Sequence, residues 1–123
     1  MSAPLTFPIL LERFFTERLI KHKHVSPHTI ASYRDTFFLL LRDAQSGLDK
    51  GPSQLTLPDL DAALIAVFLD DLQASRGTSA RSRNVRLAAI HSFFRYAALE
   101  VPEHSGLIER VLAIPSKRYE RAP

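Results

Sequence analysis

Helical periodicity is the feature of this sequence that most limits what it can fold into. Apolar residues recur at intervals of three or four in five consecutive segments, and no stretch shows the alternation of a half-buried strand between hairpin turns. In the fourth segment, Leu87, Ile90, Phe94 and Ala97 share one face. The pattern predicts an all-α fold, a compact bundle of four helices with a short fifth.

Capping residues predict where these helices begin and end. The second helix should start at Ser26-Pro27, because a serine oxygen caps the first turn and proline tolerates the first helical position. It should end at Gly47, since glycine accepts a positive φ at low cost. The same kinds of signal predict a first helix over 7–21, a third from Leu57-Pro58-Asp59 or an Asp61 cap to Gly77, a fourth from a Thr78 or Ser79 cap to Val101-Pro102, and a fifth within 103–114.

Length and composition indicate one ordinary globular domain. The chain has 123 residues, of which 46% are hydrophobic and 24% charged. We expect a helical domain over 1–114 and a linker over 115–123, because that last stretch is poor in apolar residues and lacks a capping partner. The apolar runs are too short for a membrane span, and the N-terminus has no basic segment typical of a signal peptide. The expected location is therefore the cytoplasm.

No autonomous active site is visible in the sequence. Cysteine is absent, which excludes disulfides, a thiol nucleophile and Cys-ligated metal. There is no G-x-S-x-G elbow and no glycine-rich phosphate loop. His22 and His24 would point about 200° apart on a helix, and Ser26-Pro27 interrupts the helix between His24 and His28. We expect no catalytic residue, metal or cofactor.

Positive charge is gathered in particular segments. The formal net charge is only +3, yet 76–95 holds five arginines and no acid, and 21–34 is also basic without an acid. Arginines in the first turns of a helix oppose its dipole at about 0.3–1 kcal/mol each, which suggests that an anionic partner offsets the cost. Small polar residues beside arginine also suit phosphates and base edges. The candidate DNA contacts are Lys21, Lys23, His28, Thr29, Ser32, Arg34, Ser79, Arg81, Ser82, Arg83, Asn84, Arg86, Lys117, Arg118 and Arg121. A solvated arginine face, or pairing with Asp70 and Asp71, would explain the same charge pattern.

Three segments resemble a known family in their order and spacing. They are Ser26-Pro27-His28-Thr29 followed by Tyr33-Arg34, then 78–84, then 86–96 with the sequence RLAAIHSFFRY. Together they resemble the N-terminal core-binding (SAM-like) domain of tyrosine recombinases, the phage integrase family, over about residues 7–118. Pro115-Ser116-Lys117-Arg118 resembles the linker that leads into the catalytic domain of that family.

The resemblance implies a DNA-binding arm without catalytic activity of its own. In the family, this domain forms half of a clamp around duplex DNA, and its second and fourth helices approach the major groove. The catalytic arginines, lysine, histidine and tyrosine lie in a second domain and have no counterpart here: His91 and Arg95 are spaced H-x-x-x-R rather than H-x-x-R, and Tyr119 lies in the linker. The resemblance further implies a bacterial or phage-encoded recombinase associated with the nucleoid when bound, with this arm monomeric alone and the full-length protein tetrameric on DNA.

Two other classes of protein remain open at this point. A helical protein-interaction module would use an exposed apolar surface around Phe14, Phe15, Phe38 and Leu41, although these side chains could also be ordinary core. A helix-turn-helix repressor would need a short recognition helix after a tight turn. The loops GLDKGPS and SRGTS join longer helices and match that motif poorly.

Overall fold

The computed structural model describes residues 5–22 and 24–118. Within them the chain contains helices and no strand, which confirms the predicted all-α fold. The elements are α1 Phe7–Arg13, which continues as the π-helix η1 Phe14–His22, then α2 Pro27–Leu48, α3 Ala62–Arg76, α4 Ala80–Glu100 and α5 Ser105–Leu112, with 3₁₀ turns η2 Pro52–Gln54, η3 Leu57–Asp59 and η4 Pro102–His104. No helix in this described part of the chain is both long and apolar enough to cross a membrane.

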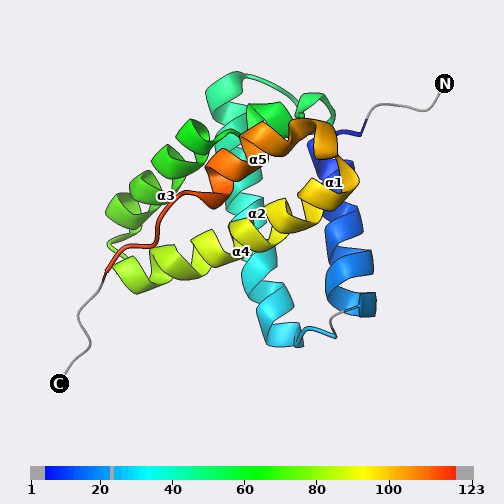
Figure 1. The fold of residues 1–123 in the computed structure, drawn as a ribbon. Helices are drawn as coiled ribbons and strands as arrows, with labels where there is room; N and C mark the ends of the chain where they lie inside the picture. The colour runs from blue at the N-terminus through cyan, green and yellow to red at the C-terminus, as the bar shows by residue number, and fades with distance from the viewer. Residues whose placement is uncertain (1–4, 23, 119–123) are drawn as a thin grey trace.

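The helices are arranged around α4. Figure 1 shows α4 crossing α2, with α3 and α4 forming a hairpin on one side and α1 with η1 on the other. The short α5 packs against both α3 and α4. After α5 the chain turns back along the α3–α4 hairpin toward the start of α4 (Figure 1).

The predicted helix starts are confirmed at atomic detail. The Ser26 hydroxyl oxygen accepts the Thr29 N–H at 3.3 Å. Asp61, the alternative cap for the third helix, accepts the Leu64 N–H at 2.9 Å, while Leu57–Asp59 forms a 3₁₀ turn ahead of it. At α4 the cap is Ser79 rather than Thr78. These bonds satisfy amides that have no partner inside the helix.

Two boundaries differ from the prediction. The second helix does not end at Gly47 but runs to Leu48, and Asp49 takes the left-handed conformation at φ 51° while its N–H donates to the Gln45 carbonyl. Aspartate tolerates this region better than most residues, so glycine was not required. The first helix reaches His22 and changes from α to π geometry at Phe14. By contrast, Gly77 ends α3 at φ 61°, as predicted.

An aromatic cluster lies at the centre of the molecule. Phe93 of α4 is fully buried, and its ring meets those of Phe7, Phe14 and Phe37 edge-on at centroid distances of 5.4, 5.5 and 5.6 Å. Edge-to-face contacts of this kind add to the gain from burial itself. The cluster therefore fastens α1, η1 and α2 to one position on α4. Tyr96 also packs against Phe14.

We expect Phe93→Ala to lower the free energy of unfolding by about 3–5 kcal/mol, since it removes a buried ring that three helical segments share. Urea denaturation followed by circular dichroism measures the change. The matched control is Phe38→Ala, because Phe38 is 60% exposed and its ring lies under the Arg42 guanidinium at the surface. The control should change stability by no more than about 1 kcal/mol. Equal losses in the two variants would contradict the central role of Phe93.

Candidate nucleic-acid interface

The starts of α2 and α4 share the same local design. Each begins with a serine cap, and neither has an acidic residue in its first turn. The positive end of each helix dipole is therefore not neutralised by its own sequence. Backbone N–H groups at such an end can donate to a phosphate.

The crossing of α2 and α4 determines where these two starts lie. Phe37 and Phe93 mark the crossing, with ring centroids 5.6 Å apart. At a rise of 1.5 Å per residue, Pro27 begins α2 about 15 Å from the crossing, and Ala80 begins α4 about 20 Å from it. Both segments project away from the crossing, that of α4 to the lower left and that of α2 downward (Figure 1).

Several of the predicted cations are accessible on these projecting segments. Arg34 and Arg81 are exposed and Arg86 is partly exposed. Within the described residues, none of these three guanidinium groups forms an ion pair with a carboxylate. Their charge is therefore available to an anionic partner. Lys21, His28, Ser32, Ser79, Lys117 and Arg118 are also exposed.

Arg83 does not lie on the surface with the other candidates. It is only 5% exposed, because position 83 lies on the same inward face of α4 as Leu87 and Ile90. Its Nε donates to Asp70 Oδ1 at 2.9 Å, and its Nη1 donates to the Pro115 carbonyl at 3.4 Å. The guanidinium connects α4 to α3 and to the segment after α5.

Asn84 is engaged in the same network. Its Nδ2 donates to the Lys117 carbonyl at 2.7 Å, and its Oδ1 accepts the Lys117 N–H at 2.8 Å. A base edge such as that of adenine would need this same pair of donor and acceptor atoms. Sequence reasoning proposed Arg83 and Asn84 as DNA contacts. The structure instead shows both holding the segment after α5.

Asp70 is the acidic centre of this network. Its Oδ1 also lies 3.2 Å from Lys117 Nζ, and Lys117 Nζ donates to Gln73 Oε1 at 3.3 Å. The hydrogen bond from Lys117 and then that from Arg83 hold the pKa of the Asp70 carboxyl below its ordinary value. Arg83 and Lys117 supply two positive charges to one carboxylate, so the group keeps a net positive charge.

The predicted hydroxyl contacts take part in capping. Ser79 Oγ accepts the Ser82 N–H at 3.2 Å and donates to Ser82 Oγ at 3.4 Å. The Thr29 hydroxyl accepts a hydrogen bond from Ser26 Oγ at 3.1 Å. These hydroxyls therefore stabilise the helix starts directly. Two further predicted contacts, Lys23 and Arg121, lie outside the described residues.

The apolar surface expected for a protein-interaction module is largely internal. Phe14 is fully buried, Phe15 and Leu41 are partly buried, and only Phe38 is mostly exposed. These segments carry more apolar residues than one helical face needs because several helices share the core.

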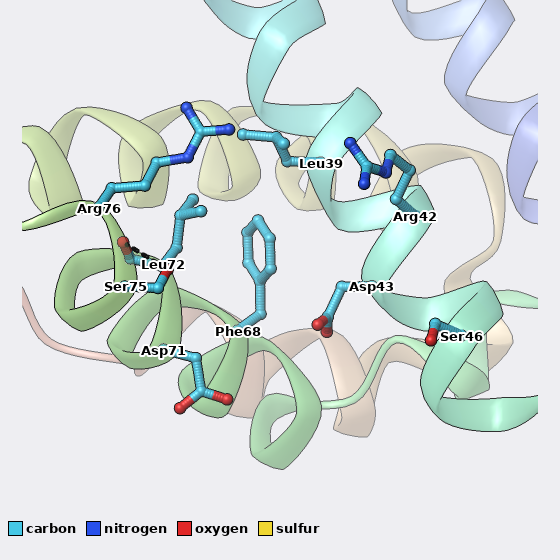
Figure 2. A pocket seen from close by; sticks show the side chains of 9 residues that line it. All are labelled: Leu39, Arg42, Asp43, Ser46, Phe68, Asp71, Leu72, Ser75 and Arg76. Atoms are coloured by element: carbon cyan, nitrogen blue, oxygen red, sulfur yellow. Dashed lines mark hydrogen bonds between the residues drawn. The ribbon is translucent and has the colours of Figure 1, made fainter.

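A groove of about 400 Å³ does lie between α2 and α3, as Figure 2 shows. Phe68 stands at its centre, with Arg42 and Arg76 toward one end and Asp43 toward the other (Figure 2). Burial and the nearby Asp71 raise the pKa of the Asp43 carboxyl. Because the groove carries both signs of charge, it does not favour a polyanion. Arg42, which lies eight residues after Arg34 on α2, is exposed but is not among the residues predicted from the sequence to contact DNA.

The profile of the family described as "Phage integrase, N-terminal SAM-like domain" matches residues 11–101. Two curated proteins of Sinorhizobium fredii are similar. "Putative integrase/recombinase y4rC" is 62% identical over 112 residues, which cover 91% of this chain and 34% of that protein. "Putative integrase/recombinase y4rD" is 45% identical over 118 residues, which cover 96% of this chain and 42% of that protein.

The chain thus spans between a third and about two fifths of the length of these relatives. No solved structure gave a significant match.

Replacing Arg83 and Arg81 separately distinguishes an internal arginine from a surface one. We expect Arg83→Ala to lower the free energy of unfolding by about 1.5–3 kcal/mol, because it removes charged hydrogen bonds in a buried position. Arg81→Ala should change it by no more than about 0.5 kcal/mol, since Arg81 is exposed and has no ion pair within the described residues. Urea denaturation provides both values. If the Arg83 variant is as stable as the Arg81 variant, the hydrogen bonds of Arg83 to Asp70 and Pro115 do not stabilise the fold.

Asp70 should make the stability of the domain depend on pH in the acid range. A carboxyl whose pKa is lowered by folding stabilises the folded state fully above its ordinary pKa of 3.8. That contribution is lost as the pH falls through the lowered folded-state pKa. The difference in unfolding free energy between the unmodified chain and Asp70→Asn should therefore be constant near neutrality and shrink below pH 3.8. A difference that stays constant throughout the acid range would contradict this assignment.

Proposed function

This chain belongs to the phage integrase family by its N-terminal SAM-like domain, and from that premise we propose that it is the DNA-binding arm of a site-specific recombinase. The observation that carries the proposal is the exposure of Arg34, Arg81 and Arg86 at the projecting segments of α2 and α4, without carboxylate partners among the described residues. In this proposal α2 and α4 face the major groove of one duplex.

The charges and the helix ends favour a binding mode based on phosphates. Arginine side chains and free N–H groups at helix starts both bind phosphate oxygens, and such contacts orient a protein on DNA without reading its sequence. Some polar side chains near the starts of α2 and α4 do not bind Asp70 or the segment after α5. Ser32 is one of them, and it is available for limited base contacts. We therefore expect weak sequence preference and strong dependence on salt.

We propose a smaller set of direct DNA contacts than the sequence alone predicts. Arg83 and Asn84 are removed from the set as direct contacts, because both bind the segment after α5. The proposed contacts that remain are Lys21, Lys23, His28, Thr29, Ser32, Arg34, Ser79, Arg81, Ser82, Arg86, Lys117, Arg118 and Arg121.

The relatives suggest how this arm would serve a larger protein. Each is two to three times the length of the matched region, and each is named as an integrase/recombinase. We propose that residues 1–114 are the arm and 115–123 the linker to a catalytic domain that performs strand exchange. In that proposal the arm alone binds DNA as a monomer without cutting it, and the full-length protein acts in the cytoplasm as a tetramer on DNA.

A salt titration of binding to a duplex oligonucleotide tests the phosphate-based mode. If about five cations contact phosphates, the logarithm of the binding constant should fall against the logarithm of salt with a slope of about −4 to −5. The affinity of the isolated chain should lie in the non-specific range, with a Kd of about 10⁻⁴–10⁻⁶ M at physiological salt. Fluorescence anisotropy measures both quantities. A slope near zero would contradict the proposal.

The double variant Arg81→Ala/Arg86→Ala should lose most duplex binding and reduce the steepness of the salt slope by about 2, one unit for each phosphate contact. Its thermal unfolding should be nearly unchanged, because both side chains are accessible and lack carboxylate partners among the described residues. The control Arg13→Ala/Arg110→Ala removes the same charge from exposed positions on α1 and α5 and should bind as the unmodified chain does. Equal losses in both double variants would show only an effect of net charge.

Nuclear magnetic resonance separates this function from that of a protein-interaction module. On addition of duplex DNA, the amide signals of 28–34 and 79–86 should move more than those around the α2–α3 groove. A chain that ignores DNA and instead self-associates would favour the interaction module.

A further inference from the structure

The segment after α5 is attached to the start of α4 by side chains of both α3 and α4. Pro115 is bound through its carbonyl by Arg83, and Lys117 is bound through both backbone groups by Asn84. The Lys117 ammonium is in turn held by Asp70 and Gln73 of α3. We refer to residues 115–118 as the docked segment.

The hydrogen bonds from Asn84 hold the backbone of Lys117 in the docked segment, and not only its flexible side chain. A side-chain amide that donates to the carbonyl and accepts from the N–H of one residue leaves that residue with a single orientation. These two bonds, at 2.7 and 2.8 Å, are among the shortest involving a side chain in the described residues. The neighbouring bond from buried Arg83 to Pro115 anchors the same segment two residues earlier.

The docked segment lies against the start of α4, so its anchoring affects the positive charge at that end of the helix. Asn84 lies three residues after Arg81 on α4, so its bonds to Lys117 bring that lysine to the part of α4 that carries the exposed Arg81. Lys117 is 45% exposed despite its contact with Asp70, and Arg118 is exposed. Together with Arg81 they would form one continuous cationic surface.

We propose that Arg83 and Asn84 are positioning residues for DNA binding, which act by docking 115–118 so that Lys117 and Arg118 extend the phosphate-binding surface of α4. This inference rests on the proposed function. It also gives a role to two polar residues in the most basic part of the chain, the buried Arg83 and the half-buried Asn84, whose side chains bind the docked segment.

A double-mutant cycle with binding measured by anisotropy on a duplex oligonucleotide tests the proposal. The variants are Asn84→Ala, Lys117→Ala/Arg118→Ala, and the triple combination, each titrated with salt. Asn84→Ala should weaken binding and reduce the steepness of the salt slope by about 1–2, because phosphate contacts made through the docked segment are lost. In the Lys117→Ala/Arg118→Ala background, Asn84→Ala should change affinity by less than about twofold.

The matched control is Gln54→Ala. Gln54 also binds backbone through its amide, accepting the Gly51 N–H at 3.0 Å, but it lies in η2, outside the docked segment and its anchors. This variant should leave both affinity and salt slope unchanged. Circular dichroism verifies that every variant is folded.

The outcomes distinguish failure of the proposed DNA binding from failure of the positioning role alone. If the unmodified chain does not bind the duplex even at low salt, the proposed function fails and the positioning role fails with it. If the chain binds but Asn84→Ala costs the same affinity with or without Lys117 and Arg118, then Asn84 contacts DNA itself and only the positioning proposal is overturned. A loss of affinity with an unchanged salt slope would overturn it in the same way.

Discussion

The contact between Phe37 and Phe93 is the point on which the rest of this structure depends. It fixes where α2 and α4 cross, and Phe7 and Phe14 bring the first helix to the same place. Because these rings are buried and meet mostly edge-to-face, small changes in helix position would lose several contacts together. From that crossing, α2 and α4 extend to their capped starts, along which Arg34 and Arg81 are exposed and Arg86 is partly exposed. These side chains belong to the proposed interface, so the packing of the core determines where the positive charge of that interface lies.

The network that links the buried Arg83 to the half-exposed Asp70 shows how one arginine-rich run serves two purposes. Arg81, Arg83 and Arg86 lie within six residues of one another, yet helical geometry turns Arg83 inward while leaving Arg81 exposed and Arg86 partly exposed. An arginine this deeply buried needs a partner, and Asp70 with the Pro115 carbonyl supplies it. The run therefore holds the hairpin of α3 and α4 together and also presents positive charge to solvent. The net charge of the run does not show which of its arginines is buried and which is exposed.

The predictions from the sequence are confirmed where the interactions that decide them join residues close together in the chain. Serine and aspartate caps at Ser26, Asp61 and Ser79 satisfy amides within three residues, so nothing distant can alter the preference greatly. The predicted end of the second helix at Gly47 was wrong, because Asp49 adopts the left-handed conformation that was expected of a glycine. The hydrogen bonds of Asn84 to Lys117 could not be predicted, for a different reason. Its partner Lys117 lies 33 residues away, and no periodic pattern relates the two positions.

The sequence by itself determined the class of fold, most helix boundaries, the family and the location of positive charge along the chain, because periodicity, capping and composition act over a few residues. Only the tertiary structure decided which of the charged residues reach solvent. That outcome depends on the crossing of α2 and α4 and on the return of the chain after α5, and both are set by packing between distant residues. A side chain such as Arg83 or Asn84 has the same chemistry in either setting, and its role follows from the partner that folding brings within hydrogen-bonding distance.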